Sequence, residues 1–204
     1  MIERGRRIPA TRTRRQPGLR LGFTLVEMLI VITMIGILTG IALWRVDIAR
    51  YQVNGDIQAI GTTLIASQRE AIAKQHNVIV VFDTAGNRVR IVWDANNNGT
   101  LDANEHSRIV FLGERVQFGL GTAPALPMGA QAVDFTDTET SSGLPCVTFY
   151  RNGSASEAGG AYITSRRAIG DPKYANDNRA MRVERATGRA EWWHYNGTTW
   201  VRGF

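Results

Sequence analysis

The feature that most constrains this chain is the apolar run from Phe23 to Trp44, in which Glu27 is the only charged residue. About 20 consecutive apolar residues suffice to cross a bilayer as a helix. A carboxylate inside such a segment costs on the order of a few kcal/mol unless it finds a partner. We therefore expect a membrane-spanning helix over residues 23–44 in which Glu27 has a functional role.

The segment before this run is strongly basic. Residues 1–22 contain seven arginines and one acid, Glu3. The whole chain has 24 Lys and Arg against 18 Asp and Glu, so removing residues 1–22 leaves 17 of each. Positive charge beside a membrane helix keeps that side in the cytoplasm. The basic pI of about 10.1 therefore indicates orientation, with the carboxyl-terminal part outside, and does not indicate nucleic-acid binding.

The residues at the start of the run carry a family resemblance. Gly22 followed by Phe23-Thr-Leu-Val-Glu27 and an apolar helix resembles the prepilin peptidase site of type IV pilins and type II secretion pseudopilins. The resemblance implies that prepilin peptidase cleaves after the leader 1–22, that the new Phe23 amine is methylated, and that residues 23–44 form the filament core. Glu27 could then pair with the Phe23 amine of a neighbouring copy. An uncleaved signal anchor is the alternative.

Past the apolar run the spacing of hydrophobic residues changes. Between residues 45 and 77 apolar side chains recur at three- and four-residue intervals or their multiples, at Val46, Val53, Ile57, Ile60, Leu64 and Ile72. This spacing is typical of an amphipathic helix. It predicts one continuous helix of about 50 residues, about 75–80 Å long at the usual helical rise, whose second half packs on a globular domain.

Residues 78–204 have the composition of a sheet. The runs 78–82 and 88–93 are β-branched and aromatic and flank a turn at 83–87, which predicts a hairpin. Further strands are expected at 107–112, 116–118, 132–135, 147–150, 161–164, 181–185 and 190–195. Residues 119–131 and 165–178 are expected to be loops, the second a solvated one. Cys146, the only cysteine, is expected to be a buried small side chain.

The predicted fold class is therefore α+β and pilin-like, with one long amino-terminal helix packed on an antiparallel sheet domain. The runs Val147–Ser154, Gly160–Thr164 and Arg182–Arg189 resemble the glycine layout of GspH/FimT minor pseudopilins and pilins. This implies a minor pseudopilin of a type II secretion pseudopilus, anchored in the bacterial inner membrane with a periplasmic domain. Its implied partners are prepilin peptidase, other pseudopilins or pilins, and secreted protein cargo.

Two other functions, DNA uptake and enzymatic activity, fit the sequence less well. Some members of the same group serve DNA uptake with basic residues near the carboxyl-terminal Gly-Arg turn, here Gly188-Arg189. Glu191 and the neutral charge of residues 23–204 do not favour nucleic-acid binding. An enzyme is not expected, because the histidines are isolated and the sequence has no nucleophile elbow or paired-cysteine metal site.

One further motif points to a metal. Residues 94–105 fit the twelve-residue calcium-loop pattern at every ligand position, namely Asp94, Asn96, Asn98, Thr100, Asp102 and Glu105, with glycine at position six. The flanking runs are strand-like, so this is no EF-hand. A polar hairpin loop without metal explains the same residues, since Asn and Gly suit turns with positive φ. The sequence leaves both interpretations open, with calcium as the one candidate cofactor.

Overall fold

The computed structural model describes residues 22–43, 47–102 and 104–203, and the chain divides into two compact units, residues 1–46 and 47–204. The first contains helix α1 (Leu25–Leu43). The second contains helix α2 (Ile48–Lys74) and the strands of the structure. Each unit is described by itself.

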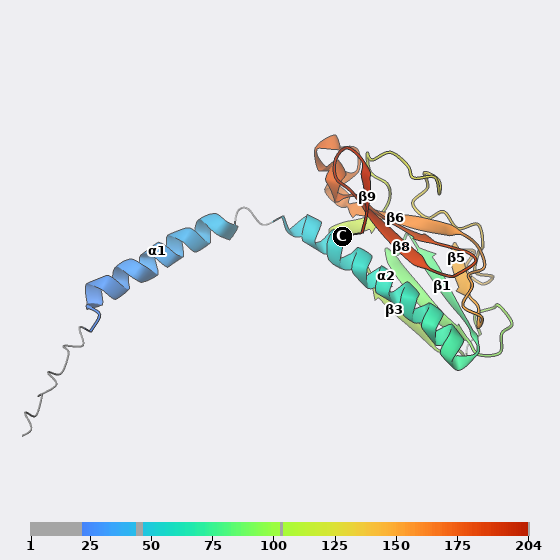
Figure 1. The fold of residues 1–204 in the computed structure, drawn as a ribbon. Coiled ribbons are helices and arrows are strands. Elements are labelled where there is room, and N and C mark those ends of the chain that lie inside the picture. Colours follow the sequence, from blue (N-terminus) through green and yellow to red (C-terminus); the bar gives the residue numbers. More distant parts are fainter. Residues whose placement is uncertain (1–21, 44–46, 103, 204) are drawn as a thin grey trace, which may run out of the picture. The chain divides into compact units, whose positions relative to one another are not determined.

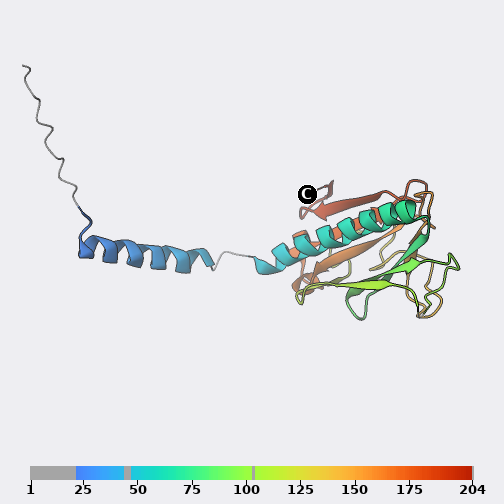
Figure 2. The same cartoon turned by 90° about the horizontal axis from the view of Figure 1, so that it is seen from below.

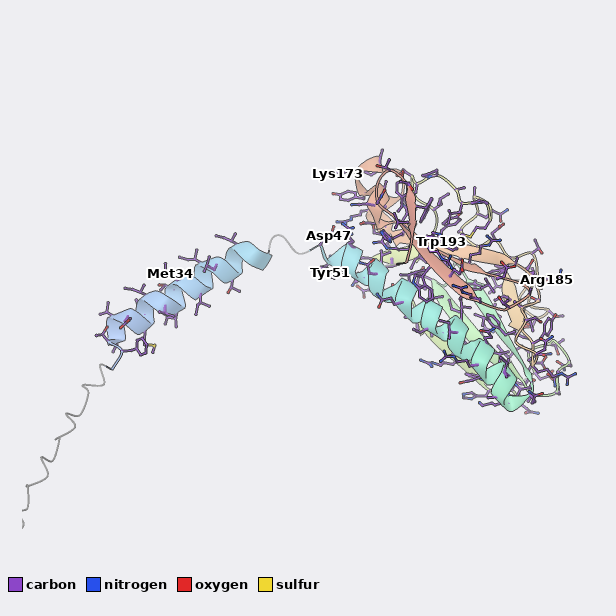
Figure 3. The ribbon with its side chains drawn as sticks, in the orientation of Figure 1. Met34, Asp47, Tyr51, Lys173, Arg185 and Trp193 are labelled. Carbon is purple, nitrogen blue, oxygen red and sulfur yellow. The ribbon has the colours of Figure 1, made fainter. Side chains whose placement is uncertain are left out.

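Over residues 25–41, helix α1 has no buried face. The side chains of residues 25–41 are all exposed, and Figure 3 shows them pointing away from the helix on every side, with Met34 among them. Among the residues that the structure describes, no helix combines the length and the apolar character needed to span a membrane.

Helix α2 begins at a cap of its own. Asp47 has non-helical backbone angles (φ −84°, ψ 80°), and its side chain accepts a hydrogen bond from Arg50 N. Such a cap satisfies one of the free N–H groups of a first helical turn. The structure therefore departs at Asp47 from the continuous helix that the sequence predicts, while residues 44–46 lie outside the described residues. At the other end Gln75, with φ 57°, closes the helix in a left-handed conformation.

The core face of α2 follows the predicted spacing. Its buried residues are Ala49, Val53, Ile57, Ile60, Gly61, Leu64, Ser67 and Ala71. Ile72, expected on this face, is 44% exposed, because Ala71 takes the core position in the last turns. Val46 lies outside the described residues.

Two antiparallel sheets form the rest of the globular unit. The first has the order β3-β2-β1-β5, from β1 (Asn77–Asp83), β2 (Arg88–Asp94), β3 (Ser107–Phe111) and β5 (Cys146–Phe149). The second has the order β4-β6-β7-β8-β9, from β4 (Val116–Phe118), β6 (Gly159–Ser165), β7 (Arg179–Val183), β8 (Ala190–Tyr195) and β9 (Trp200–Arg202). The expected α+β architecture, a helix packed on antiparallel sheets, is confirmed.

Helix α2 lies along both sheets (Figures 1 and 2), touching β1 and β5 of the first and β4, β6, β7 and β8 of the second. The main hydrophobic core forms where they meet. It joins Ile57 and Leu64 of the helix to Phe82 of the first sheet and Ile163 of the second. All its buried members lie in the unit 47–204, so this unit carries its own core.

Strand β1 is buried on both faces, which explains its unbroken apolar run. A second small cluster joins Ile79 and Val81 to Cys146, with Leu101 and Leu144 packed against it. Burial raises the pKa of the Cys146 thiol to about 12. The predicted role of Cys146 as a buried small side chain is confirmed.

Three local predictions need correction. Residues 132–135 form only an isolated bridge, Val133 to Ala161, and β9 was not expected. The segment 165–178 contains two short 3-10 helices, η1 (Arg166–Ala168) and η2 (Pro172–Asp177). It is not simply a solvated loop, because Arg167 contacts both Asp177, which is 1% exposed, and Asp47.

Candidate functional site

The predicted processing site lies in non-helical chain just before α1. Thr24 caps the helix, because its Oγ1 accepts a hydrogen bond from Glu27 N at 3.2 Å. Phe23 is 73% exposed. A Cβ added at Gly22 would meet nothing within 4 Å, and the backbone there has no positive φ. The described fold therefore does not itself require glycine at this position.

Glu27 stands on the exposed first turn of α1. No ion pair to it is found among the described residues. The large apolar side chains of α1, from Leu25 to Ile41, are between 45% and 82% exposed. An apolar surface of this extent is typical of a region that contacts lipid or protein.

The calcium-type loop joins β2 to β3 and is closed by its own hydrogen bonds. Asp94 is fully buried, and its carboxylate accepts from Asn98 N at 3.0 Å and Gly99 N at 2.9 Å. The side-chain amides of Asn96 and Asn98 both donate to Asp102 Oδ2 at 2.8 Å. The six predicted ligand residues are thus held in one loop, but their polar atoms bind one another.

Glu105 completes this closure. Its Oε1 accepts from Ala95 N at 3.0 Å and its Oε2 from Asp102 N at 3.2 Å. Asn98 Oδ1 accepts from both the N–H and the hydroxyl of Thr100 at 2.8 Å. Within the described residues, no three His, Cys, Asp or Glu side chains are grouped so that they could hold a metal ion. The geometry supports the polar-turn interpretation, and calcium binding stays a prediction.

The glycines of the GspH-like layout meet at a junction with α2. Gln68 Nε2 donates to the carbonyl oxygen of Gly153 at 2.7 Å and to that of Thr187 at 2.5 Å. A Cβ at Gly188 would lie 2.3 Å from the oxygen of Gly153. These two glycines therefore have a packing role. Gln68, which ties both turns to the helix, was missed because no local spacing marks it.

The arginine of the Gly188-Arg189 turn forms an ion pair. Glu191 of β8 contacts both Arg189, at 3.4 Å, and Arg202 of β9. Glu191 and these two arginines together carry one net positive charge.

Two of the nearby tryptophans pack against other parts of the globular unit. Trp192 packs against the main core and lies over Gly61. Trp200 donates to the carbonyl of Pro124 at 2.7 Å and lies against the ring of Tyr162. Trp193, labelled in Figure 3, is half-buried.

The three histidines each contact a different group. His76 follows α2 and contacts the carbonyl of Asn77, and His106 lies against the ring of Trp93. His194 of β8 contacts the carbonyl of Gly203. These contacts do not assemble a nucleophile with a general base.

Comparisons with known proteins agree with the amino-terminal motif. Residues 19–43 match the prokaryotic N-terminal methylation motif. A structure of the minor pseudopilin EpsH from the type 2 secretion system of Vibrio cholerae has 12% identity and a TM-score of 0.35, and the match covers 74% of this chain and 96% of that one. A second EpsH crystal structure has 13% identity and a TM-score of 0.35, with coverages of 75% and 94%. No curated protein matches the chain.

The motif match covers the segment around Gly22 and Glu27, and the helix packed on antiparallel sheets occupies residues 47–204. The chain therefore carries an N-terminal methylation motif over residues 19–43, followed by a globular unit in which a helix packs on antiparallel sheets.

Proposed function

We propose that this chain is a minor pseudopilin of a type II secretion pseudopilus. Prepilin peptidase cleaves between Gly22 and Phe23, the new amino terminus is methylated, and the subunit joins other pilin-like subunits through its apolar helix. The observation that carries this proposal is the N-terminal methylation motif over residues 19–43. The exposed apolar surface of α1 supports it, because that surface is suited to packing in lipid or among other helices.

Membrane anchoring is part of the same proposal. The apolar run continues to Trp44, beyond the described end of α1 at Leu43. Seven arginines precede the run, and this positive charge supports a cytoplasmic leader. The globular unit then lies on the periplasmic side of the inner membrane, where it can meet neighbouring subunits and secreted cargo.

Cleavage is tested by expressing the full chain with and without a prepilin peptidase and determining its mass and amino-terminal sequence. The wild type should give a product that starts at Phe23. Gly22→Leu should stay at full length, because the peptidase must fit the residue before the scissile bond closely. Gly36→Leu is the control, since a Cβ at Gly36 also meets nothing within 4 Å. Accumulation of a Phe23 product from Gly22→Leu would refute the proposal.

The DNA-uptake alternative is disfavoured by the carboxyl-terminal turn. Glu191 contacts both Arg189 and Arg202, and residues 23–204 have equal numbers of acidic and basic side chains. Binding to duplex DNA depends on cationic groups that neutralise phosphates. The secretion pseudopilus is therefore the assignment that we retain.

A further inference from the structure

A basic pocket lies at the start of α2. It has a volume of about 180 Å³ and is lined by Arg50, Asn54, Arg179 and His194. Arg50 and Asn54 are four residues apart on α2 and therefore share a face. Arg179 of β7 and His194 of β8 are directly paired across the strands. Three elements of the globular unit thus bring two guanidinium groups and an imidazole together.

Arg179 is buried, with only 2% of its surface exposed. Its Nε donates to Asn54 Oδ1 at 2.9 Å, and its Nη1 donates to the carbonyls of Asn176 and Asn178 at 2.8 and 2.7 Å. Among the described residues, no carboxylate forms an ion pair with it. Burial and, to a smaller extent, the positive charge of Arg50 lower the pKa of Arg179 to about 10, while the negative charge of Asp177 acts in the opposite direction.

The acids near this pocket are already engaged. Asp177 interacts with Arg179, and Asp47 with Arg50, through their charges. Both carboxylates also form ion pairs with Arg167, at 2.9 and 2.5 Å. Three arginines therefore face two carboxylates, which leaves one positive charge before His194 is counted. A buried charge without a counter-ion is costly, so the pocket is suited to an anion of one negative charge or more.

We propose that this pocket binds a phosphate group. A guanidinium presents a planar fork of donors that fits phosphate oxygens. Arg50, Arg179 and His194 come from three elements, and a tetrahedral phosphate has oxygens in more directions than a planar carboxylate. His194 Nδ1 donates to the carbonyl of Gly203 at 2.7 Å.

The phosphate can come from a lipid headgroup or from solution. The lipid source rests on the proposed membrane anchoring of residues 23–44. Arg50 follows Trp44 by six residues, a separation of at most about 20 Å in a fully extended chain. The phosphodiester of an anionic lipid carries one negative charge, which matches the excess of one positive charge at the pocket. A phosphatidylglycerol headgroup is thus the occupant that we expect.

The test uses residues 45–204, which contain the whole described core, with an acetylated amino terminus to avoid an added positive charge. Inorganic phosphate is titrated by calorimetry at physiological salt, with NMR shifts of the Arg179 and His194 signals as the second readout. In a second arm, vesicles containing phosphatidylglycerol are compared with vesicles of phosphatidylcholine alone in a sedimentation assay.

Arg50→Gln removes one exposed member of the pocket and should weaken phosphate binding about tenfold or more, the loss expected for one charge-assisted hydrogen bond. Arg69→Gln is the matched control, because it removes the same charge from an exposed position on the same helix. Arg179→Lys keeps the charge but cannot reproduce the hydrogen bonds that hold the guanidinium against Asn54, Asn176 and Asn178, and it should also weaken binding. Circular dichroism shows whether each variant is folded.

Phosphate binding together with phosphatidylglycerol-dependent sedimentation supports the lipid source. Phosphate binding without sedimentation supports the same pocket with free phosphate as its ligand. No phosphate binding by the wild type, or an equal loss in Arg50→Gln and Arg69→Gln, overturns the proposal. The fragment lacks residues 1–44, so these results do not depend on whether the full chain is cleaved at Gly22.

Discussion

Gly188 lies directly against the carbonyl oxygen of Gly153, so that a Cβ at residue 188 would stand 2.3 Å from that oxygen. The turn after β5 and the turn before β8 therefore meet where Gln68 of α2 binds both. The contact joins the first sheet, the second sheet and the helix. Gly153 and Gly188, which lie in separate turns, thus determine how closely the two sheets and α2 approach one another.

Replacing Gly188 with alanine should lower the free energy of unfolding of residues 45–204 by about 2 kcal/mol or more. Gly188 has φ +60°, and non-glycine residues held in such strained regions cost about 1–3 kcal/mol. The clash with Gly153 adds to this cost. Urea unfolding followed by circular dichroism gives the measurement.

Gly197→Ala separates the two causes. Gly197 also has a positive φ, +96°, but a Cβ there would meet nothing within 4 Å. We expect Gly197→Ala to show only the backbone cost. Equal losses in the two variants would show that the contact with Gly153 contributes nothing.

The buried carboxylate of Glu139 should make stability depend on acid pH. Burial alone would raise the pKa of Glu139, but hydrogen bonds from the hydroxyls and N–H groups of Ser142 and Ser141 lower it from 4.5 to about 2. Because the folded pKa is depressed, the contribution is present above pH 4.5 and is lost as the pH falls towards 2. A shift of this size corresponds to about 3 kcal/mol.

Unfolding free energies of the fragment 45–204, measured between pH 5 and pH 2, test this point. In Glu139→Gln the decline with acid should be shallower than in the wild type. Glu114→Gln is the control, because Glu114 is exposed. If the free energy of unfolding of Glu139→Gln falls with acid as steeply as that of the wild type, Glu139 is not the cause of the pH dependence.

Glu27→Ala should block assembly without blocking processing. The carboxylate is exposed on α1, and in an apolar setting it needs a cation, for which the Phe23 amine of a neighbouring subunit is available. The variant should therefore insert and be cleaved normally but be absent from sheared filaments in an immunoblot. Met28→Ala serves as the control. Defective insertion with normal assembly would contradict this role.

Calcium should raise the melting temperature of the fragment only at high concentration. Of the six predicted ligand residues, Asp94, Asp102 and Glu105 are the anionic ones, and the pattern predicts a dissociation constant on the order of 10⁻⁴ to 10⁻³ M. Calcium must also replace the hydrogen bonds from Asn96 and Asn98 to Asp102. A ligand that binds the native state raises its stability with concentration.

Thermal melts with several millimolar calcium or with a chelator measure this effect. Glu105→Gln keeps the shape of the side chain but removes its charge, and it should abolish the response. If calcium does not change the melting temperature of the wild type, residues 94–105 act only as a hydrogen-bonded polar turn.

Duplex DNA should bind the fragment weakly. Glu191 contacts Arg189 and Arg202, so Glu191→Gln should free both arginines and increase an affinity that falls steeply with salt. Gel shifts at two salt concentrations measure the change, with Glu184→Gln, which removes an exposed acid, as the control. Micromolar or tighter binding by the wild type would favour DNA uptake over secretion.

Local patterns in the sequence were enough to predict the main elements. The spacing of Val53, Ile57 and Leu64 predicted the buried face of α2, and the β-branched runs around residues 83–87 predicted the β1–β2 hairpin. The apolar run with Glu27 predicted the prepilin-like amino terminus. Each of these signals is local, because helix and strand periodicity and the cleavage motif each depend on neighbouring residues.

Tertiary structure decided what distant residues do together. Asp47 ends the predicted continuity of the helix through its cap and its contact with Arg167, which lies 120 positions away. Arg179 directly follows the segment 165–178, which the sequence predicts to be a loop, yet it is buried beside Asn54, 125 positions away. Residues 94–105 match a metal pattern, but their carboxylates accept hydrogen bonds from the loop itself. Residue spacing along the chain does not predict these contacts, because they form only when the two sheets pack against α2.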